Sequence, residues 1–253
     1  MTLLRRVRKA SRAGLQFRQA RSDNIRWARQ DFILENVDRV DPTSLVQTPH
    51  LQQRTHQVSR YNQMVEIARQ VRSQGVTGDV LEFGTWQGTG LLLLGKAFAG
   101  SGARTLLGVD SFEGLPEAST IWTQGQFADC SMEHVSARVT SCLEADQSLV
   151  LVKGWFDERR VAEEIWEASS DLAVVHLDAD LGSSTTQALR IVEPYIAQLR
   201  HPIFLLFDDW GCHPDEVPDA FYSWWEEVRD RYDLTWQKVA SSRYTRYLRV
   251  SPT

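Results

Sequence analysis

The sequence predicts an α/β protein with a mostly parallel sheet that helices cover on both faces. Short and nearly continuous apolar runs begin at residue 79 and recur along the chain. Stretches with helical spacing separate most of them, and acidic residues close several of the runs. Short apolar strands that alternate with helices are typical of parallel sheets buried on both faces. A chain of 253 residues is long enough for one large core of this kind.

Each element has its own signal. Residues 59–75 place apolar side chains near helical spacing and stop at Gly75, so we expect a helix there. Five strands are expected at 79–84, 105–112, 148–154, 172–180 and 202–210. Helices are expected at 88–100, 158–169, 184–199 and 218–232. Residues 235–250 are expected to add two antiparallel strands as a hairpin at the sheet edge.

The N-terminal segment differs in charge from the rest of the chain. Residues 1–30 hold nine Arg or Lys and a single acid, Asp23, which gives a formal charge of +8. The whole chain carries −5, so the remainder carries −13. We therefore divide the chain into a basic arm or helical extension at 1–50 and one domain at 51–253, with the turn-rich stretch 41–50 between them.

Such an arm could contact membrane headgroups, nucleic acid or an acidic protein surface, and an Arg-rich start also resembles an organelle transit peptide. A solvated helix, or an arm docked on its own acidic body, would carry the same charges. No nucleic-acid motif or aromatic interleaving accompanies the basic residues, so we do not expect nucleic acid as a partner. We expect the arm to pack on a partner subunit of a homo-oligomer or to cover an acidic acceptor cleft.

Composition argues against several classes of protein. No apolar run reaches the roughly 20 residues of a membrane helix, and the N-terminus lacks the apolar core of a signal peptide. Cys130, Cys142 and Cys212 are scattered and odd in number, without a Cys-x-x-Cys pair. This argues against a disulfide framework and against a zinc site. We expect a cytoplasmic protein.

The loop after the first strand reads Glu82-x-Gly84-x-x-x-Gly88-x-Gly90. It lacks the G-x-G-x-x-G spacing of a dinucleotide site, and no Gly-Lys-Ser/Thr of a P-loop follows. Glu82 would repel a pyrophosphate but suits a ligand that is cationic and carries no phosphate, such as S-adenosylmethionine. A tight structural turn is the alternative interpretation. From this loop we expect four residues to contact the cofactor: Glu82, Gly84, Thr85 and Gly88.

Carboxylates gather where the expected strands end. Ligands bind at the carboxyl ends of the strands in such a sheet. Asp110 closes the second strand, where it is placed to accept hydrogen bonds from ribose hydroxyls. An isolated aspartate at a strand end usually caps a helix or forms a turn. Several in one crevice would repel each other unless a cation or a cationic ligand lies among them. The others in this set are Asp178, Asp180, Asp208 and Asp209.

Five motifs carry a family resemblance. They are VLEFGTWQG (80–88), VDSFEGLPE (109–117), VKGWFDE (152–158), HLDADLGSST (176–185) and FDDW (207–210). Together and in this order they resemble the macrocin O-methyltransferase family over about residues 59–232. The resemblance implies a Rossmann-like class I methyltransferase fold, S-adenosylmethionine as methyl donor, a divalent metal, usually magnesium, and sugar hydroxyls of antibiotics as acceptors.

The resemblance also implies roles for individual residues. Asp178, Asp208 and Asp209 match the metal ligands, and carboxylates suit magnesium or calcium. Asp180 matches the general base. Further cofactor contacts are expected from Ser111 and Phe112, from Gly154 and Trp155 after the third strand, and from Asp178.

Other features bear on the acceptor and on the base. A metal that holds two vicinal hydroxyls would lower the pKa of the attacked one, and Asp180 could take its proton. His213, in the loop beyond the Asp pair, is the alternative base. Family members usually carry Tyr where this chain has Gly182, and a Tyr where it has Trp210. Five tryptophans could stack on adenine or a sugar face, with Trp155 the best placed for adenine: Trp122, Trp155, Trp210, Trp224 and Trp225.

We therefore expect a metal-assisted S-adenosylmethionine O-methyltransferase that acts on a glycosylated or polyhydroxylated small molecule in natural-product biosynthesis. One alternative is a methyltransferase of nucleic acid or protein that the basic arm docks. The other is a non-catalytic relative that binds the cofactor or a sugar.

Overall fold

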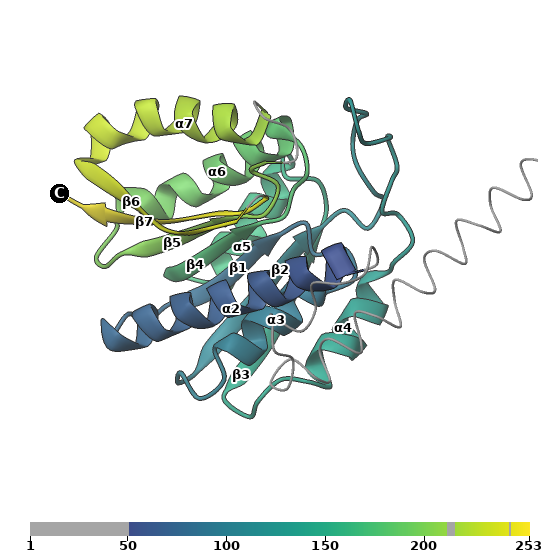
Figure 1. The fold of residues 1–253 in the computed structure, drawn as a ribbon, viewed down its shortest axis with the longest axis horizontal. Coiled ribbons are helices and arrows are strands. Elements are labelled where there is room, and N and C mark those ends of the chain that lie inside the picture. The colour runs from purple at the N-terminus through teal and green to yellow at the C-terminus, as the bar shows by residue number, and fades with distance from the viewer. Residues whose placement is uncertain (1–50, 212–215, 243) are drawn as a thin grey trace, which may run out of the picture. The chain divides into compact units, whose positions relative to one another are not determined.

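The computed structural model describes residues 51–211, 216–242 and 244–253, and side chains from residue 58 onward (Figure 1). The basic arm, Cys212 and His213 lie outside the described residues. The chain divides into two compact units, Met1–Arg60 and Tyr61–Thr253, and the second contains the whole sheet.

The sheet has seven strands in the order β3-β2-β1-β4-β5-β7-β6. The first five in this order pair in parallel, whereas β7 pairs antiparallel with both β5 and β6. Their bounds are Asp79–Phe83 (β1), Arg104–Asp110 (β2), Gln147–Lys153 (β3), Leu172–Leu177 (β4), Ile203–Phe207 (β5), Leu234–Ser241 (β6) and Arg246–Pro252 (β7). The predicted parallel sheet with an antiparallel C-terminal edge is confirmed.

Helices cover both faces of this sheet (Figure 1). Their bounds are Leu51–Ser73 (α2), Thr89–Ala97 (α3), Met132–Thr140 (α4), Arg159–Ala168 (α5), Gly182–Ala197 (α6) and Glu216–Tyr232 (α7). Buried side chains of α5, α6 and α7 join one face of the strands in a single apolar core. Its sheet side consists of alternate residues such as Leu81, Phe83, Leu107 and Val109, as the two-residue period of a strand requires. No helix in the described part of the chain is long and apolar enough to cross a membrane.

Several elements differ from their expected form. Helix α2 begins at Leu51, eight residues before the expected start. Strands β4 and β5 end at Leu177 and Phe207, each three residues before its expected end. Helix α4 has no counterpart among the expected elements, since Val135 and Val139 are its only buried residues. Its start is a side-chain cap in which Ser131 Oγ accepts from the backbone N–H of His134 at 3.3 Å.

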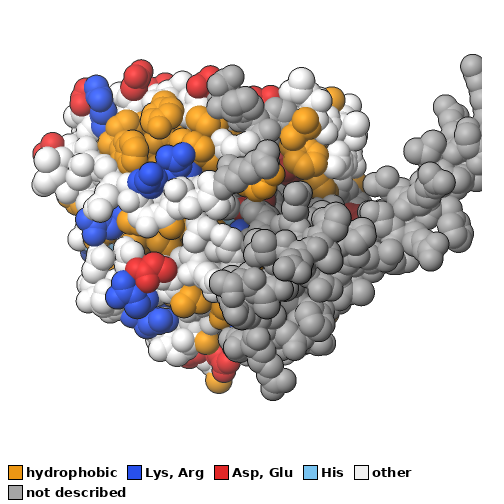
Figure 2. Space-filling view, viewed as in Figure 1, with side chains coloured by type: hydrophobic (Ala, Val, Ile, Leu, Met, Phe, Trp, Pro, Cys, Tyr) orange, Lys and Arg blue, Asp and Glu red, His pale blue; other side chains and the backbone are white. Residues whose placement is uncertain are grey.

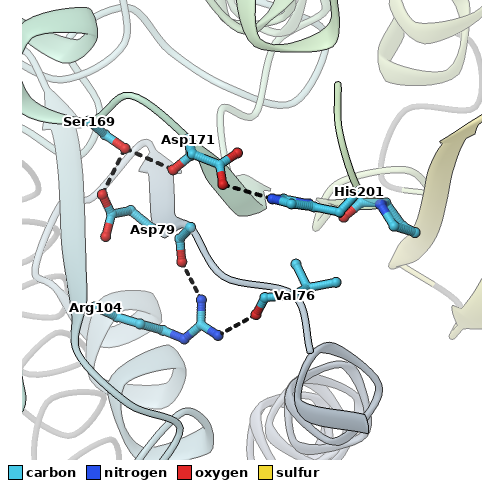
Figure 3. A network of polar contacts seen from close by, with 8 residues as sticks. Val76, Asp79, Arg104, Ser169, Asp171 and His201 are labelled. Carbon is cyan, nitrogen blue, oxygen red and sulfur yellow. Dashed lines mark hydrogen bonds and ion pairs between the residues drawn. The ribbon is translucent and has the colours of Figure 1, made fainter. Parts of the chain in front are cut away.

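A polar network ties together the starts of four parallel strands, at the edge opposite to their carboxyl ends (Figure 3). Asp171, just before β4, accepts from His201 Nε2 at 2.7 Å, and His201 precedes β5. Ser169 Oγ donates to Asp79 Oδ2 of β1 at 2.7 Å. Arg104 of β2 donates to the carbonyl of Val76 at 2.9 Å. These contacts hold the amino ends of the four strands together.

Aromatic side chains fill the space beside the antiparallel edge. The ring centroid of Phe221 in α7 lies 5.4 Å from that of Phe207 and 5.9 Å from that of Trp236 in β6. Figure 2 shows hydrophobic side chains gathered on this face in the region of α7 and the β6–β7 hairpin. Trp224 and Trp225 are buried in this cluster, which makes them core residues of the fold.

Candidate active site

The strand order places a crevice at the carboxyl ends of β1 and β4. Strands β2 and β3 lie on one side of β1, and β4 and β5 lie on the other. Ligands bind at such a switch point in open α/β sheets. The predicted strand-end acids Asp110, Asp178 and Asp208 all lie at this edge of the sheet.

Gly84 brings the turn after β1 directly against the end of β4. Its φ is 83°, and a Cβ at this position would overlap the carbonyl oxygen of Asp178. The backbone N–H of Asp178 in turn donates to the carbonyl of Phe83 at 3.0 Å. Only glycine allows this approach, so the glycine that suggested a ligand loop also joins the two turns that flank the crevice.

Asp110 is held by two backbone N–H groups. Trp86 N–H donates to its Oδ2 at 2.7 Å and Phe112 N–H to its Oδ1 at 2.6 Å. Both donors have positive φ, 41° for Trp86 and 55° for Phe112, which is uncommon for side chains of this size. Burial raises the pKa of the Asp110 carboxyl, and the two backbone hydrogen bonds offset part of this rise. A carboxylate fixed in this way retains lone pairs for the hydroxyl groups of a ligand.

The other predicted cofactor residues surround Asp110 and the turn after β1. Gly154 N–H donates to the carbonyl of Asp110 at 2.9 Å, which places the start of the Gly154–Trp155 turn beside it. Thr85 and Ser111 are buried, and Ser111 Oγ donates to the carbonyl of Gly114 at 3.2 Å. These contacts bring the predicted set together at one end of the sheet, and their role toward a cofactor stays a prediction.

Glu82 lies deeper than the other predicted cofactor residues. It is 1% exposed, and its Oε1 lies 2.9 Å from Nδ1 of the fully buried His176. A Cβ on Gly90, in the first turn of α3, would overlap the same oxygen. Glu82 and Gly90 are therefore packed against each other at the start of α3, and His176 forms a buried contact with Glu82.

The acids after β4 and β5 lie on neighbouring chain segments. Asp208 N–H donates to the carbonyl of Leu177 at 3.0 Å, so the backbones of Asp208 and of the turn that starts at Asp178 run side by side. Asp208 and Asp209 are buried and Asp178 is half-buried. Asp180 occupies a tight turn with φ at 59°, closed by a 2.6 Å hydrogen bond from Leu181 N–H to the carbonyl of Ala179. Backbone strain of this kind is typical of functional sites.

One group of side chains among the described residues has metal-ligand spacing. One ligand atom each from Glu82, His176 and Asp178 lie within 4.8 Å of one another. Two carboxylates and an imidazole suit zinc, manganese or iron better than magnesium, which prefers oxygen ligands. Asp178 belongs both to this group and to the predicted all-carboxylate set with Asp208 and Asp209. The donor chemistry of that set fits magnesium, but its three side chains are not a group with this spacing among the described residues.

Sequence reasoning missed contacts made by the loop between β2 and α4, residues 111–131. Trp86 Nε1–H donates to Asp129 Oδ1 at 2.7 Å, and the rings of Trp86 and Phe127 have centroids 4.9 Å apart. Glu117 accepts from Ser183 Oγ, in the first turn of α6, at 2.5 Å. The residues of these pairs are 41 to 66 positions apart, and no local pattern signals such contacts. Only the tryptophan content of the chain pointed to aromatic contacts near the site.

Trp210 and Gly182, the two positions at which the chain departs from the family resemblance, both lie against other elements of the fold. Trp210 follows the Asp pair, and its ring lies 5.2 Å from the centroid of Phe207 and 5.2 Å from the guanidinium of Arg246. A Cβ on Gly182 would lie 2.8 Å from the carbonyl oxygen of Glu216, at the start of α7. The glycine therefore admits the α7 backbone at the position where the family resemblance predicts a Tyr. The alternative base His213 lies outside the described residues.

Comparison with known proteins agrees with this arrangement. The macrocin-O-methyltransferase (TylF) family model matches residues 9–234. The 8-demethyl-8-(2,3-dimethoxy-α-L-rhamnosyl)-tetracenomycin-C 4'-O-methyltransferase of Streptomyces olivaceus is 26% identical over 219 residues, which is 81% of this chain and 79% of that protein. The demethyldecarbamoylnovobiocin O-methyltransferase of Streptomyces niveus is 23% identical over 198 residues, or 74% and 71% of the two chains.

Solved structures show the same fold. The O-methyltransferase NovP superposes with a TM-score of 0.57 at 22% identity, over 75% of this chain and 78% of its own. The calicheamicin methyltransferase CalS11 superposes with a TM-score of 0.56 at 22% identity, over 88% and 91%. The fold is therefore the Rossmann-like fold of O-methyltransferases. The chain is an S-adenosylmethionine-dependent O-methyltransferase, and it belongs to the macrocin-O-methyltransferase family.

Proposed function

We propose that this enzyme transfers the methyl group of S-adenosylmethionine to a hydroxyl of a sugar in a glycosylated small molecule. The observation that carries the proposal is the strained turn at Asp180, with φ at 59°, beside the glycine turn and the buried Asp208–Asp209 pair. The named activities of the two Streptomyces relatives, one on a rhamnosyl group and one on a novobiocin precursor, support a sugar-bearing acceptor.

The chemistry assigned to this chain is a direct displacement. The acceptor oxygen attacks the methyl carbon in line with the breaking carbon–sulfur bond, and S-adenosylhomocysteine leaves as a neutral thioether. The hydroxyl proton passes to the Asp180 carboxylate, which the turn holds at the edge of the crevice. Asp110 holds the ribose hydroxyls, which fixes the position of the methyl group relative to the acceptor. His213 is the alternative base.

We further propose that Asp178, Asp208 and Asp209 hold a divalent cation, with magnesium as the first candidate. Their oxygen donors are those that magnesium prefers, and the buried positions of Asp208 and Asp209 favour a counter-charge. When bound, such a cation lowers the pKa of a coordinated hydroxyl. The group Glu82, His176 and Asp178 is the competing set, and it would favour a transition metal.

The remaining features of the function are also proposals. We place the enzyme in the cytoplasm and in natural-product biosynthesis, as a homo-oligomer that assembles through its basic arm. Two alternatives to this function remain. In one, the arm docks a macromolecular acceptor, and in the other the chain binds the cofactor or a sugar without catalysing transfer.

A mass-shift assay tests the function directly. The purified chain is incubated with S-adenosylmethionine and either 8-demethyl-8-(2,3-dimethoxy-α-L-rhamnosyl)-tetracenomycin C, demethyldecarbamoylnovobiocin or methyl α-L-rhamnopyranoside. We expect one methyl group, about 14 Da, on at least one glycoside, loss of transfer in EDTA, and its recovery with magnesium. Asp180→Asn should abolish transfer while S-adenosylhomocysteine still binds. Transfer to total RNA or protein but to none of the glycosides would instead establish the macromolecular alternative.

A further inference from the structure

Arg246 interrupts the apolar pattern of the strand in which it lies. In β7 it belongs to the same face of the sheet as Leu248 and Val250, which are buried in the apolar core. The register pairs Arg246 with Phe207, the last residue of β5, so it lies at the edge of the sheet that carries the strand-end acids. A charged residue in an apolar row is unfavourable for folding, and such departures from pattern are typical of functional positions.

The guanidinium of Arg246 contacts an aromatic ring instead of an acid. Its Cζ lies 5.2 Å from the ring centroid of Trp210, which follows the Asp208–Asp209 pair. The residue is half-buried, and Nε is the only one of its nitrogens that is buried without a hydrogen-bond partner. Because the two terminal nitrogens have no hydrogen bond among the described residues either, these donors are open to solvent and to a ligand.

A guanidinium held over an indole keeps its donors available. The cation–π attraction leaves the N–H groups at the edge of the guanidinium free to bind two oxygens of one carboxylate or phosphate. Burial of Nε removes water from one side of the charge, and an anion that pairs with the guanidinium offsets this cost. Tyr222 of α7 extends the aromatic surface, since it is 44% exposed and its ring centroid lies 5.8 Å from that of Trp210.

The strand order sets the separation between Arg246 and the proposed base. Asp180 lies in the turn after β4, and Arg246 lies on β7, two strands further along the sheet and away from Asp110. Neighbouring strands are about 4.8 Å apart, so the two positions are on the order of 10 Å apart along this edge. A sugar with its reacting hydroxyl at Asp180 fits within that separation. The group that reaches Arg246 is then the one to which the sugar is attached.

We propose that Arg246 binds an anionic group, a phosphate or a carboxylate, on the part of the acceptor to which the methylated sugar is attached. Acceptors of this class are glycosyl phosphates, sugar nucleotides included, and glycosides of acidic aglycones. The neighbouring Asp208–Asp209 pair is acidic, so the Arg246–Trp210 contact is what favours an anion at this end of the crevice. The proposal rests on the proposed function, since it requires a sugar as acceptor.

Arg249 provides a matched control in the same strand. It is also half-buried with a buried Nε that lacks a partner, but it lies on the other face of the sheet and donates from Nη2 to Gln237 Oε1 at 3.3 Å. The acceptors are α-L-rhamnosyl phosphate, 4-carboxyphenyl α-L-rhamnopyranoside and the neutral methyl α-L-rhamnopyranoside. We expect Arg246→Gln to raise the KM of an anionic acceptor roughly 10- to 100-fold, the usual range for hydrogen bonds to a charged group, with a much smaller change for the neutral one. Arg246→Lys should restore part of the loss, and Arg249→Gln should cause none.

Calorimetry on the complex with S-adenosylhomocysteine makes the test independent of turnover. We expect the wild-type enzyme to bind at least one anionic rhamnoside more tightly than the methyl rhamnoside, and the tighter one identifies the anion as phosphate or carboxylate. Arg246→Gln should lose this preference, and Arg249→Gln should keep it. Equal affinity of the wild type for all three compounds, or a preference that survives Arg246→Gln, overturns the proposal. Methyl transfer to the neutral rhamnoside would leave the proposed function intact in either case.

Discussion

In the free protein, the environment of Asp110 disfavours the ionised carboxylate that a ligand would bind. Burial disfavours its charged form, and two backbone N–H groups at strained positions offset part of this effect. Because the folded state raises its pKa, Asp110 contributes most to stability in acid, below the pKa of the unfolded chain. That contribution is lost as the pH rises through the folded pKa. Ligand binding has the opposite dependence, since ribose hydroxyls bind the ionised form.

We therefore expect S-adenosylhomocysteine to stabilise the enzyme increasingly as the pH rises through the pKa of Asp110, which lies above the ordinary value of 3.8. Asp110→Asn should flatten this dependence and weaken binding at neutral pH by roughly 10- to 100-fold, as expected for hydrogen bonds to a charged group. Calorimetry and melting curves between pH 4 and 7 measure both effects. Glu144→Gln, an exposed carboxylate before β3, is the control. If the stabilisation by S-adenosylhomocysteine depends on pH equally in the wild type, Asp110→Asn and Glu144→Gln, Asp110 has no role in cofactor binding.

The sequence was a reliable guide to residues at strand ends and a poor one to side-chain partners. Asp110, Asp178 and Asp208 could be placed at one edge of the sheet because apolar strand runs stop next to them. The depth of Glu82 could not be foreseen, because it depends on His176 in another strand and on Gly90 above it. The Trp86–Asp129 hydrogen bond joins residues 43 positions apart, so no local pattern contains it.

Helix α4 packs against the glycine turn, which is the turn after β1 that contains Gly84 and Gly88. A Cβ on Gly88 would lie 2.9 Å from methyl groups of both Val135 and Val139, so the turn and the helix are in direct contact. Arg138 Nη1 donates to the carbonyl of Gln87 at 2.7 Å. Strong strands and amphipathic helices could be predicted from their periods. A nine-residue helix with two buried valines has too little pattern to be found in this way.

Arg138→Met keeps much of the aliphatic stem but removes the donor to the glycine turn. We expect the free energy of unfolding to fall by about 1–3 kcal/mol, and S-adenosylhomocysteine to bind several-fold more weakly because the turn is less well held. Chemical denaturation and calorimetry are the measurements. Arg159→Met in α5 is the matched control, since Arg159 is 90% exposed and pairs with exposed Glu163, a contact of little consequence for stability. If the two variants behave alike, α4 has no special role in holding the turn.

At the scale of the whole molecule, charge separates the arm from the body. Residues 1–30 carry +8 and the remainder −13, and the family match begins at residue 9, within the arm. The fold of the body followed from its alternating pattern of strands and helices. The sequence of the arm has no comparable alternating pattern, so its role cannot be predicted in the same way.

Removal of residues 1–30 should change the oligomeric state or raise the acceptor KM, with the affinity for S-adenosylhomocysteine largely retained. Sedimentation velocity and steady-state kinetics measure the two effects. A full-length variant with the nine Arg and Lys replaced by Gln distinguishes charge from length and should show the same change. Unchanged assembly and kinetics, together with lost binding to anionic vesicles, would favour a membrane-docking role instead.

The position of β7 between β5 and β6 has a consequence for how the enzyme is made. Strand β5, Ile203–Phe207, is entirely buried and apolar, but its second neighbour is synthesised about 40 residues later. While the ribosome is still translating α7 and β6, β5 presents an open hydrophobic edge to other nascent chains. The pair Asp208–Asp209 comes directly after β5 in the sequence. A chain that stalls before residue 246 lacks β7, so we expect its active site to be incompletely folded and the chain to be prone to aggregate. Late elongation is therefore the vulnerable stage of its biogenesis.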